Sequence, residues 1–245
     1  MAALDRSEVK NHSRQLIRNA NSRVLTASLI VLALSVLTSM LSSRLVGLTA
    51  NEATRYLQYV QNGDADAAVS YLLTLTPTPG ARLINLLLDC VNIIVGLGFT
   101  IFLLNTLRGA APDLGNLLDG FNFWWKVLVL DLLCGLFVFL WSLLLVVPGI
   151  IAMYRYSMVN YLLINHPEYG IMECIRESKR LTSGWKAELF KLDLSFLGWW
   201  LLCLVPVIGW LLTVWVVPYR NLSVLQYYER ISGYSAEADR FSPEW

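Results

Sequence analysis

The strongest constraint on the fold is a series of apolar stretches, each close to the ~20 residues that a helix needs to cross a lipid bilayer. Six such stretches follow one another along the 245-residue chain, at 25–46, 83–107, 123–147, 149–164, 190–205 and 208–227. Only 15% of the residues are charged, whereas a soluble domain carries about 25%. The sequence therefore predicts an all-α fold, a polytopic membrane helix bundle with six transmembrane helices at residues 24–232.

Two breaks divide the longest apolar runs. Pro148 and Gly149 interrupt a run from Phe123 to Ile164 that is too long for one membrane-spanning helix at ~1.5 Å per residue. The stretch from Pro206 to Gly209 interrupts the last run in the same way. Each break is expected to form a tight hairpin turn at one membrane face. The last four helices should therefore form two helical hairpins.

The distribution of Lys and Arg among the connecting segments predicts the orientation, because cytoplasmic loops are enriched in these cations. The richer set of segments is predicted to be cytoplasmic, which places both termini inside (N-in/C-in). That set holds Arg6, Lys10, Arg14, Arg18, Arg23, Arg108, Lys126, Arg176, Lys179, Arg180, Lys186, Lys191, Arg230 and Arg240. The opposite side holds Arg44, Arg55 and Arg82.

The first 23 residues are predicted to form a cytoplasmic amphipathic helix. Asp5 and Glu8 resemble a capping box that opens a helix running to about Ala20. Such a helix can lie on an anionic membrane surface with its cations near lipid headgroups; alternatively, it is a solvated lead-in to the first span. The headgroup candidates recur every four residues, at Arg6, Lys10, Arg14 and Arg18, beside an apolar strip of Val9, Leu16, Ile17 and Ala20.

Three further segments are expected outside the bilayer. Gly170 as N-cap, Glu173 three residues later and Gly184 as terminator predict an inner amphipathic helix at 170–183. The outer loop, 47–82, is predicted to form two short helices separated at 62–64. Residues 233–245 are predicted to form a cytoplasmic tail. The apolar face of the inner helix is predicted to contain Ile171, Met172, Cys174, Ile175, Ser178 and Leu181.

Charged and polar residues inside the spans are the candidate functional site, because each is costly in the bilayer unless it is paired or faces a cavity. Depths counted from the span ends predict that Asp89 pairs with Arg155 and Asp131 with Arg220. These pairs either fix the register of the helices or form a path for protons, ions or a polar substrate. The candidates are Asn85, Asp89 and Asn92 on one helix face with Gly96 and Thr100, and then Asp131, Arg155, Asp193 and Arg220.

Signatures of enzymes and of bound metals are missing from the sequence. The two histidines, His12 and His166, are far apart, and the four cysteines form no CxxC pair. Neither a P-loop nor a G-x-S-x-G motif occurs. We expect no enzymatic activity, no metal, no cofactor and no nucleic-acid partner. The expected partners are the lipid bilayer and a membrane protein or a second copy of the chain.

The second half of the chain contains a set of motifs between about Phe121 and Ser232. Its residues are Leu140–Ile150, Tyr154, Tyr156–Met158, Asn165, Pro167, Glu168, Glu173, Ile175, Ser178, Gly184, Lys186, Phe190, Leu194–Phe196, Gly198, Trp199, Gly209, Pro218, Tyr219, Tyr227 and Tyr228. This set resembles the bacterial integral-membrane proteins grouped as domain-of-unknown-function family 975 and, more remotely, the membrane domain of some glycerophosphodiester phosphodiesterases. The resemblance implies a multi-pass protein of the bacterial cytoplasmic (inner) membrane, without an assigned mechanism.

These observations favour a non-enzymatic accessory or scaffold protein that contacts lipids or a membrane partner. The alternative is a small ion- or proton-coupled transporter that uses the buried Asp and Arg residues. A dry, packed interior would favour the first function and a water-accessible cavity the second.

Overall fold

The structure is a computed structural model that describes residues 6–19, 22–46, 50–74, 78–110, 113–203, 205 and 208–233, and these residues form helices and no strand. The predicted cap Asp5, residues 75–77, Pro206 and the tail from 234 lie outside this part of the chain. The helices are α1 Arg6–Asn19, α2 Arg23–Val46, α3 Ala50–Gln61, α4 Ala65–Thr74, α5 Pro79–Leu107, α6 Trp124–Leu144, α7 Val146–Tyr156, α8 Val159–Asn165, α9 Ile171–Leu181, α10 Lys186–Leu194, α11 Leu197–Cys203 and α12 Ile208–Ser232, with short 3₁₀ helices at Leu114–Leu117 and Asp119–Phe123.

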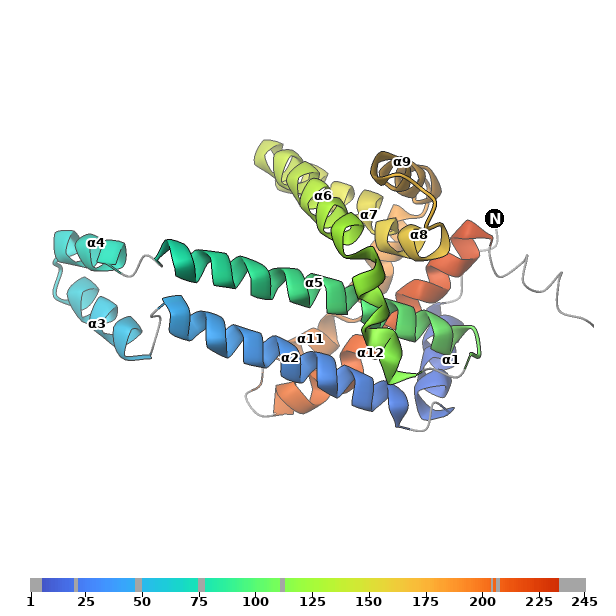
Figure 1. Cartoon of the computed structure of the whole chain (residues 1–245), viewed down its shortest axis with the longest axis horizontal. Helices are drawn as coiled ribbons and strands as arrows, with labels where there is room; N and C mark the ends of the chain where they lie inside the picture. Colours follow the sequence, from blue (N-terminus) through green and yellow to red (C-terminus); the bar gives the residue numbers. More distant parts are fainter. Residues whose placement is uncertain are drawn as a thin grey trace, which may run out of the picture. The chain divides into compact units, whose positions relative to one another are not determined.

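The chain divides into two compact units, and α2 and α5 contribute to both. The smaller unit, Ile30–Ile93, contains most of α2, the short helices α3 and α4, and the first half of α5 (Figure 1). Inside it the Asn92 side chain of α5 donates a hydrogen bond of 2.9 Å to Thr38 of α2. Residues 62–64 separate α3 from α4, as the sequence predicts, and Gly63 has a positive φ of 74°.

The larger unit, Met1–Leu29 with Ile94–Trp245, contains the α6–α7 hairpin. The turn is at Leu145, whose extended backbone separates α6 from α7, so the prediction of a turn at Pro148–Gly149 is displaced by one helical turn. Pro148 instead lies in the first turn of α7, where a missing N–H costs nothing. Gly149 faces Ser142 of α6 so closely that a Cβ would overlap its side chain and backbone.

Three helical segments are long and apolar enough to cross a membrane among the described residues: Arg23–Leu45, Pro79–Leu107 and Leu114–Leu144. The predicted spans 149–164 and 190–205 are not single helices. The first is divided into α7 and α8 at Ser157–Met158, and the second into α10 and α11 at Ser195–Phe196. The chain is therefore an all-helical protein with helices suited to a membrane.

The break between α7 and α8 is stabilised by two tertiary hydrogen bonds. The Arg155 carbonyl group accepts 2.9 Å and 3.4 Å hydrogen bonds from the hydroxyls of Ser178 and Thr182. Ser178 belongs to α9 and Thr182 is its C-cap residue. A buried backbone carbonyl group that has no hydrogen bond within its own helix needs such a donor from elsewhere in the protein. Ser178 of α9 and the C-cap residue Thr182, both buried, thus supply the donors at the break.

Candidate functional site

The site is built around an ion pair between α10 and α12. The Arg220 guanidinium donates two hydrogen bonds to the Asp193 carboxylate, from Nε at 2.8 Å and from a terminal nitrogen at 3.0 Å. The Tyr154 hydroxyl of α7 donates a third, at 2.9 Å. Asp193 lies in the last turn of α10, where the helix dipole disfavours an anion. Arg220 of α12 and Tyr154 of α7 therefore stabilise the Asp193 carboxylate, whereas the dipole of α10 does not.

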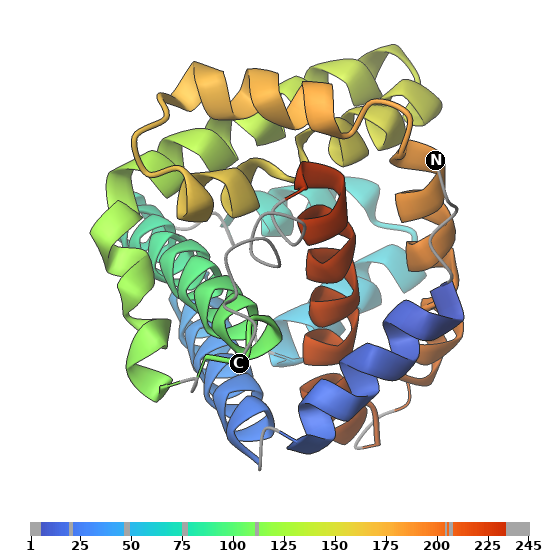
Figure 2. The ribbon, with the colours of Figure 1, turned by 90° about the vertical axis from the view of Figure 1, so that its right-hand side faces the viewer.

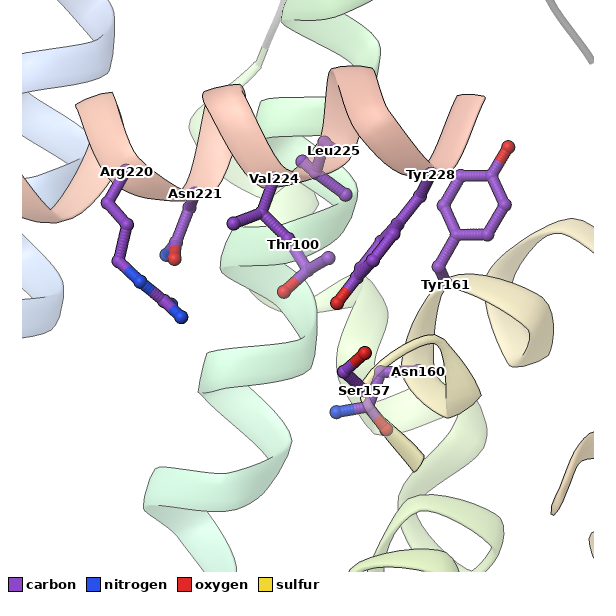
Figure 3. A pocket seen from close by; sticks show the side chains of 9 residues that line it. All are labelled: Thr100, Ser157, Asn160, Tyr161, Arg220, Asn221, Val224, Leu225 and Tyr228. Carbon is purple, nitrogen blue, oxygen red and sulfur yellow. The ribbon is translucent and has the colours of Figure 1, made fainter. Parts of the chain in front are cut away.

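A half-open cavity of about 240 Å³ lies beside this ion pair. Arg220 and Asn221 project into it from α12, opposite Ser157 and Asn160 at the α7–α8 break (Figure 3). The complete lining is Thr100, Ser157, Asn160, Tyr161, Arg220, Asn221, Val224, Leu225 and Tyr228. Seven of these nine side chains carry a hydroxyl, carboxamide or guanidinium group, and only Val224 and Leu225 do not. The cavity is therefore predominantly polar.

A second ion pair lies next to the cavity and was not predicted from the sequence. Glu229 of α12, which is buried, accepts hydrogen bonds from Arg108 at 3.0 Å and 2.6 Å and from the Tyr161 hydroxyl at 3.3 Å. Arg108 follows directly after α5 and also binds Asn165. In the sequence, Arg108 is only one of the predicted cytoplasmic cations, and the last predicted span ends at Tyr227, before Glu229. Opposite charges just beyond the ends of two predicted spans were the signal for this pair.

The predicted pair of Asp131 with Arg220 is wrong, since Arg220 binds Asp193. Asp131 is exposed on α6 and forms no ion pair with a described residue. Depth counted along each span located Arg220 but could not tell which neighbouring helix faces it. The Arg155 side chain is half-buried and likewise forms no ion pair within the described part of the chain. Because Asp89 and Arg155 belong to different units, their pairing stays a prediction.

The three polar candidates of the smaller unit differ in their surroundings. Asn92 joins α5 to α2 through Thr38 and also donates to the Leu88 carbonyl group at 3.0 Å. The Asn85 carbonyl oxygen is buried without a hydrogen-bond partner among the described residues. Asp89 is exposed on α5. In this unit, therefore, Asn92 has the structural role of fixing the register between two long helices.

Helix α1 packs on α12, as Figure 2 shows with α1 in blue and α12 in red. Ser13 is the centre of the contact, since its hydroxyl lies 3.0 Å from the Ser223 hydroxyl and 2.7 Å from the Gln226 side-chain nitrogen. Val9 and Ile17 of the predicted apolar strip are buried. The strip is therefore used for packing within the protein, which neither sequence interpretation of this helix anticipated.

The four headgroup candidates on α1 fall into two pairs. Lys10 lies 4.5 Å from the centre of the Phe196 ring and donates to the Ser195 carbonyl group at 3.2 Å. Arg14 lies 5.3 Å from the centre of the Tyr219 ring. Burial, together with the neighbouring charges of Arg14 and Arg6, lowers the pKa of Lys10. Arg14 is exposed, as are Arg6 and Arg18, but Arg6 and Arg18 contact no aromatic ring of the described residues.

The comparisons with known proteins identify the segment that carries the site. The fold, with its partly buried ion pairs, defines an all-helical protein suited to a membrane. Residues 143–235 match the model of a family described as a protein of unknown function (DUF975). This is the family that the motifs predict. It contains Tyr154, Asp193, Arg220, Glu229 and all of the cavity lining except Thr100.

No curated protein and no solved structure matches the chain. The remote similarity to the membrane domain of glycerophosphodiester phosphodiesterases therefore has no support from these comparisons.

Proposed function

We propose that this is a multi-pass protein of the bacterial inner membrane with six spans and both termini in the cytoplasm. The three long apolar helices supply three spans, and the 25-residue helix α12 is long enough for a fourth. The broken pairs α7–α8 and α10–α11 would supply the other two. Broken helices occur within membranes where the freed backbone is buried in protein or lines a cavity. Ser178 and the cavity beside Ser157 meet this condition at the α7–α8 break.

The role that the geometry favours is that of a non-catalytic accessory or scaffold protein that contacts lipids or a membrane partner. The closed hydrogen bonding of the Arg220–Asp193–Tyr154 cluster carries this proposal. The carboxylate accepts three hydrogen bonds and the guanidinium binds it through two nitrogens. A bidentate pair of this kind is a fixed structural link, whereas a proton relay needs a carboxyl group that can lose its partner.

The alternative role, a small ion- or proton-coupled transporter, is favoured by one observation. The polar cavity opens beside Arg220 and next to a helix break, and substrate sites of secondary transporters are often formed by such discontinuous helices.

Reporter fusions test the membrane topology. Fusions at Gly63 and in the turn at Leu145 should report the outside, and fusions at Gly184 and at the C-terminus the inside. Gly63 in the cytoplasm would contradict the proposed topology.

Purified protein in liposomes separates the two roles. The accessory role predicts no proton flux and no solute uptake above empty liposomes. Flux that disappears in Asp193→Asn, and that persists in the exposed control Glu168→Gln, would establish the transporter instead.

A further inference from the structure

We propose that the cavity beside Arg220 binds a neutral polyhydroxyl group, either a small soluble polyol or the hydroxyl-rich headgroup of a lipid. The cavity has a volume of about 240 Å³, whereas one water occupies roughly 30 Å³ of the liquid. There is therefore room for a small polyol and not only for a single bridging water. The proposal rests on which hydrogen-bonding groups of the lining are already used and which are free.

Two carboxamides supply free donors and acceptors at opposite walls of the cavity (Figure 3). The side chains of Asn160 and Asn221 line it and form no hydrogen bond with a described residue. Each offers two N–H donors and a carbonyl oxygen. At Arg220, Nε and one terminal nitrogen bind Asp193, which leaves the second terminal nitrogen for a ligand. Asn221 is half-buried and Asn160 is exposed, so these groups are accessible to water or to a ligand that enters the half-open cavity.

The hydroxyl groups of the lining act mainly as acceptors. Thr100 donates its only hydroxyl proton to the Gly96 carbonyl group at 3.0 Å, and Ser157 donates to the Tyr154 carbonyl group at 2.8 Å. A hydroxyl that donates in this way still has oxygen lone pairs to offer. The lining thus combines amide and guanidinium donors with hydroxyl and amide acceptors.

The charge of the lining favours a neutral ligand. The positive charge of Arg220 is balanced by Asp193, and Arg108 beyond Tyr161 is balanced by Glu229. No uncompensated cation is therefore available for a phosphate or a carboxylate, and the lone pairs of Thr100 and Ser157 would repel one. A polyol, in which every hydroxyl both donates and accepts, matches a lining of mixed donors and acceptors without net charge.

The source of the polyol depends on the proposed membrane topology. With both termini in the cytoplasm, Thr100, Asn160 and Arg220 lie in the cytoplasmic halves of their helices. The ligand would then come from the cytoplasm or from the inner leaflet. Binding measured in micelles does not depend on orientation, so a failure of the topology and a failure of this inference are separate outcomes.

The binding test uses the full-length protein in lauryldimethylamine oxide, a detergent without a sugar headgroup that could compete. Equilibrium dialysis measures the binding of labelled glucose, of myo-inositol and of inorganic phosphate. Native mass spectrometry measures the retention of monoglucosyl diacylglycerol against phosphatidylcholine. We expect saturable binding of at least one polyol probe and weaker binding of phosphate. Binding of the soluble polyols alone or of the glycolipid alone would support the proposal and identify the source.

Variants of the two carboxamides test where the polyol binds. Asn160→Leu combined with Asn221→Leu should weaken binding roughly tenfold or more, since it removes at least two hydrogen bonds. Asn11→Leu, at an exposed position of α1, is the matched control and should leave binding unchanged. If the double variant does not fold, Asn221→Ser should still weaken binding measurably. Unaltered binding in a folded variant, tighter binding of phosphate, or a cavity that holds water only would overturn the proposal.

Discussion

The guanidinium of Arg220 binds the carboxylate of Asp193 through two nitrogens, at 2.8 Å and 3.0 Å, and so joins the middle of α12 to the last turn of α10. The side chain of Arg220 is 33% exposed and that of Asp193 21%. The pair is therefore neither fully desolvated nor a surface pair. Tyr154 extends the link to α7, and the polar cavity begins at the same guanidinium.

Breaking this pair should destabilise the protein. Because both side chains are partly exposed, we expect Asp193→Asn to lower the free energy of unfolding by about 1–3 kcal/mol, less than the loss of a fully buried partner. Adding Arg220→Gln should restore part of that loss, since it removes the uncompensated charge. Unfolding of the purified protein by SDS in mixed micelles measures each change. The control is Glu8→Gln at the exposed 3.9 Å pair with Arg230, for which we expect no measurable loss. Additive losses in the double variant would contradict the coupling.

The sequence predicted the residues of this pair but not the pairing. Asp193 and Arg220 stand out as charges in apolar runs, and counting along a helix gives their depth. Which residue of a neighbouring helix faces Arg220 depends on how the helices are rotated and packed. The position of a residue along its own helix does not give this information. The break of the predicted fourth span was missed for a similar reason. Ser157 and Met158 carry no proline or glycine signal, and the Arg155 carbonyl group is satisfied by Ser178 from a distant helix.

Local signals, in contrast, predicted α9 and the division of the loop 47–82 into α3 and α4. Glu173 accepts a hydrogen bond from the Gly170 backbone at 3.3 Å, as the expected cap of α9 requires. Gly184 has a positive φ of 89°, which glycine adopts at little cost. Of the predicted apolar face of α9, Cys174, Ile175 and Ser178 are buried, whereas Met172 is 58% exposed. Helix caps and turns are determined by residues that are adjacent in the sequence, so they can be predicted from the sequence alone.

The close approach of α6 and α7 at Gly149 makes a second prediction. In Gly149→Ala the added methyl group meets Ser142, so one helix must shift, and we expect a loss of about 1–3 kcal/mol in the free energy of unfolding. Gly135→Ala on α6 is the matched control, because a Cβ there meets nothing within 4 Å. The same SDS unfolding experiment measures both. Equal effects of the two substitutions would show that α6 and α7 do not pack at Gly149.

Acid should weaken α9 through Glu177. Hydrogen bonds from Arg180 hold the pKa of Glu177 below its ordinary value of 4.5. A carboxyl group with a lowered pKa stabilises the fold above its unfolded pKa, and this contribution is lost as the pH falls through the lowered value. The difference in thermal midpoint between the wild type and Glu177→Gln should therefore shrink as the pH falls below 4.5. A difference that stays constant over this range would contradict the ion pair.

The cations of α1 should separate into two functions. Arg6 and Arg18 are exposed, and a cation near an anionic membrane surface contributes roughly 1 kcal/mol. We therefore expect Arg6→Gln with Arg18→Gln to weaken the stabilisation of the protein by anionic lipid, measured in nanodiscs of phosphatidylglycerol against phosphatidylcholine. Lys10→Gln with Arg14→Gln carries the same change in charge and is the matched comparison.

Lys10 lies over Phe196 at the break between α10 and α11, and Arg14 lies over Tyr219 of α12. Their replacement should therefore loosen α1 from this break and from α12 in either lipid. Amide hydrogen exchange measures this directly. The protection of α1 should fall in Lys10→Gln with Arg14→Gln and be kept in Arg6→Gln with Arg18→Gln. The opposite pattern, with α1 released by the loss of Arg6 and Arg18, would mean that the membrane rather than α12 holds this helix. Equal loss of the lipid effect in both double variants would mean that all four cations face headgroups, as the sequence alone suggested.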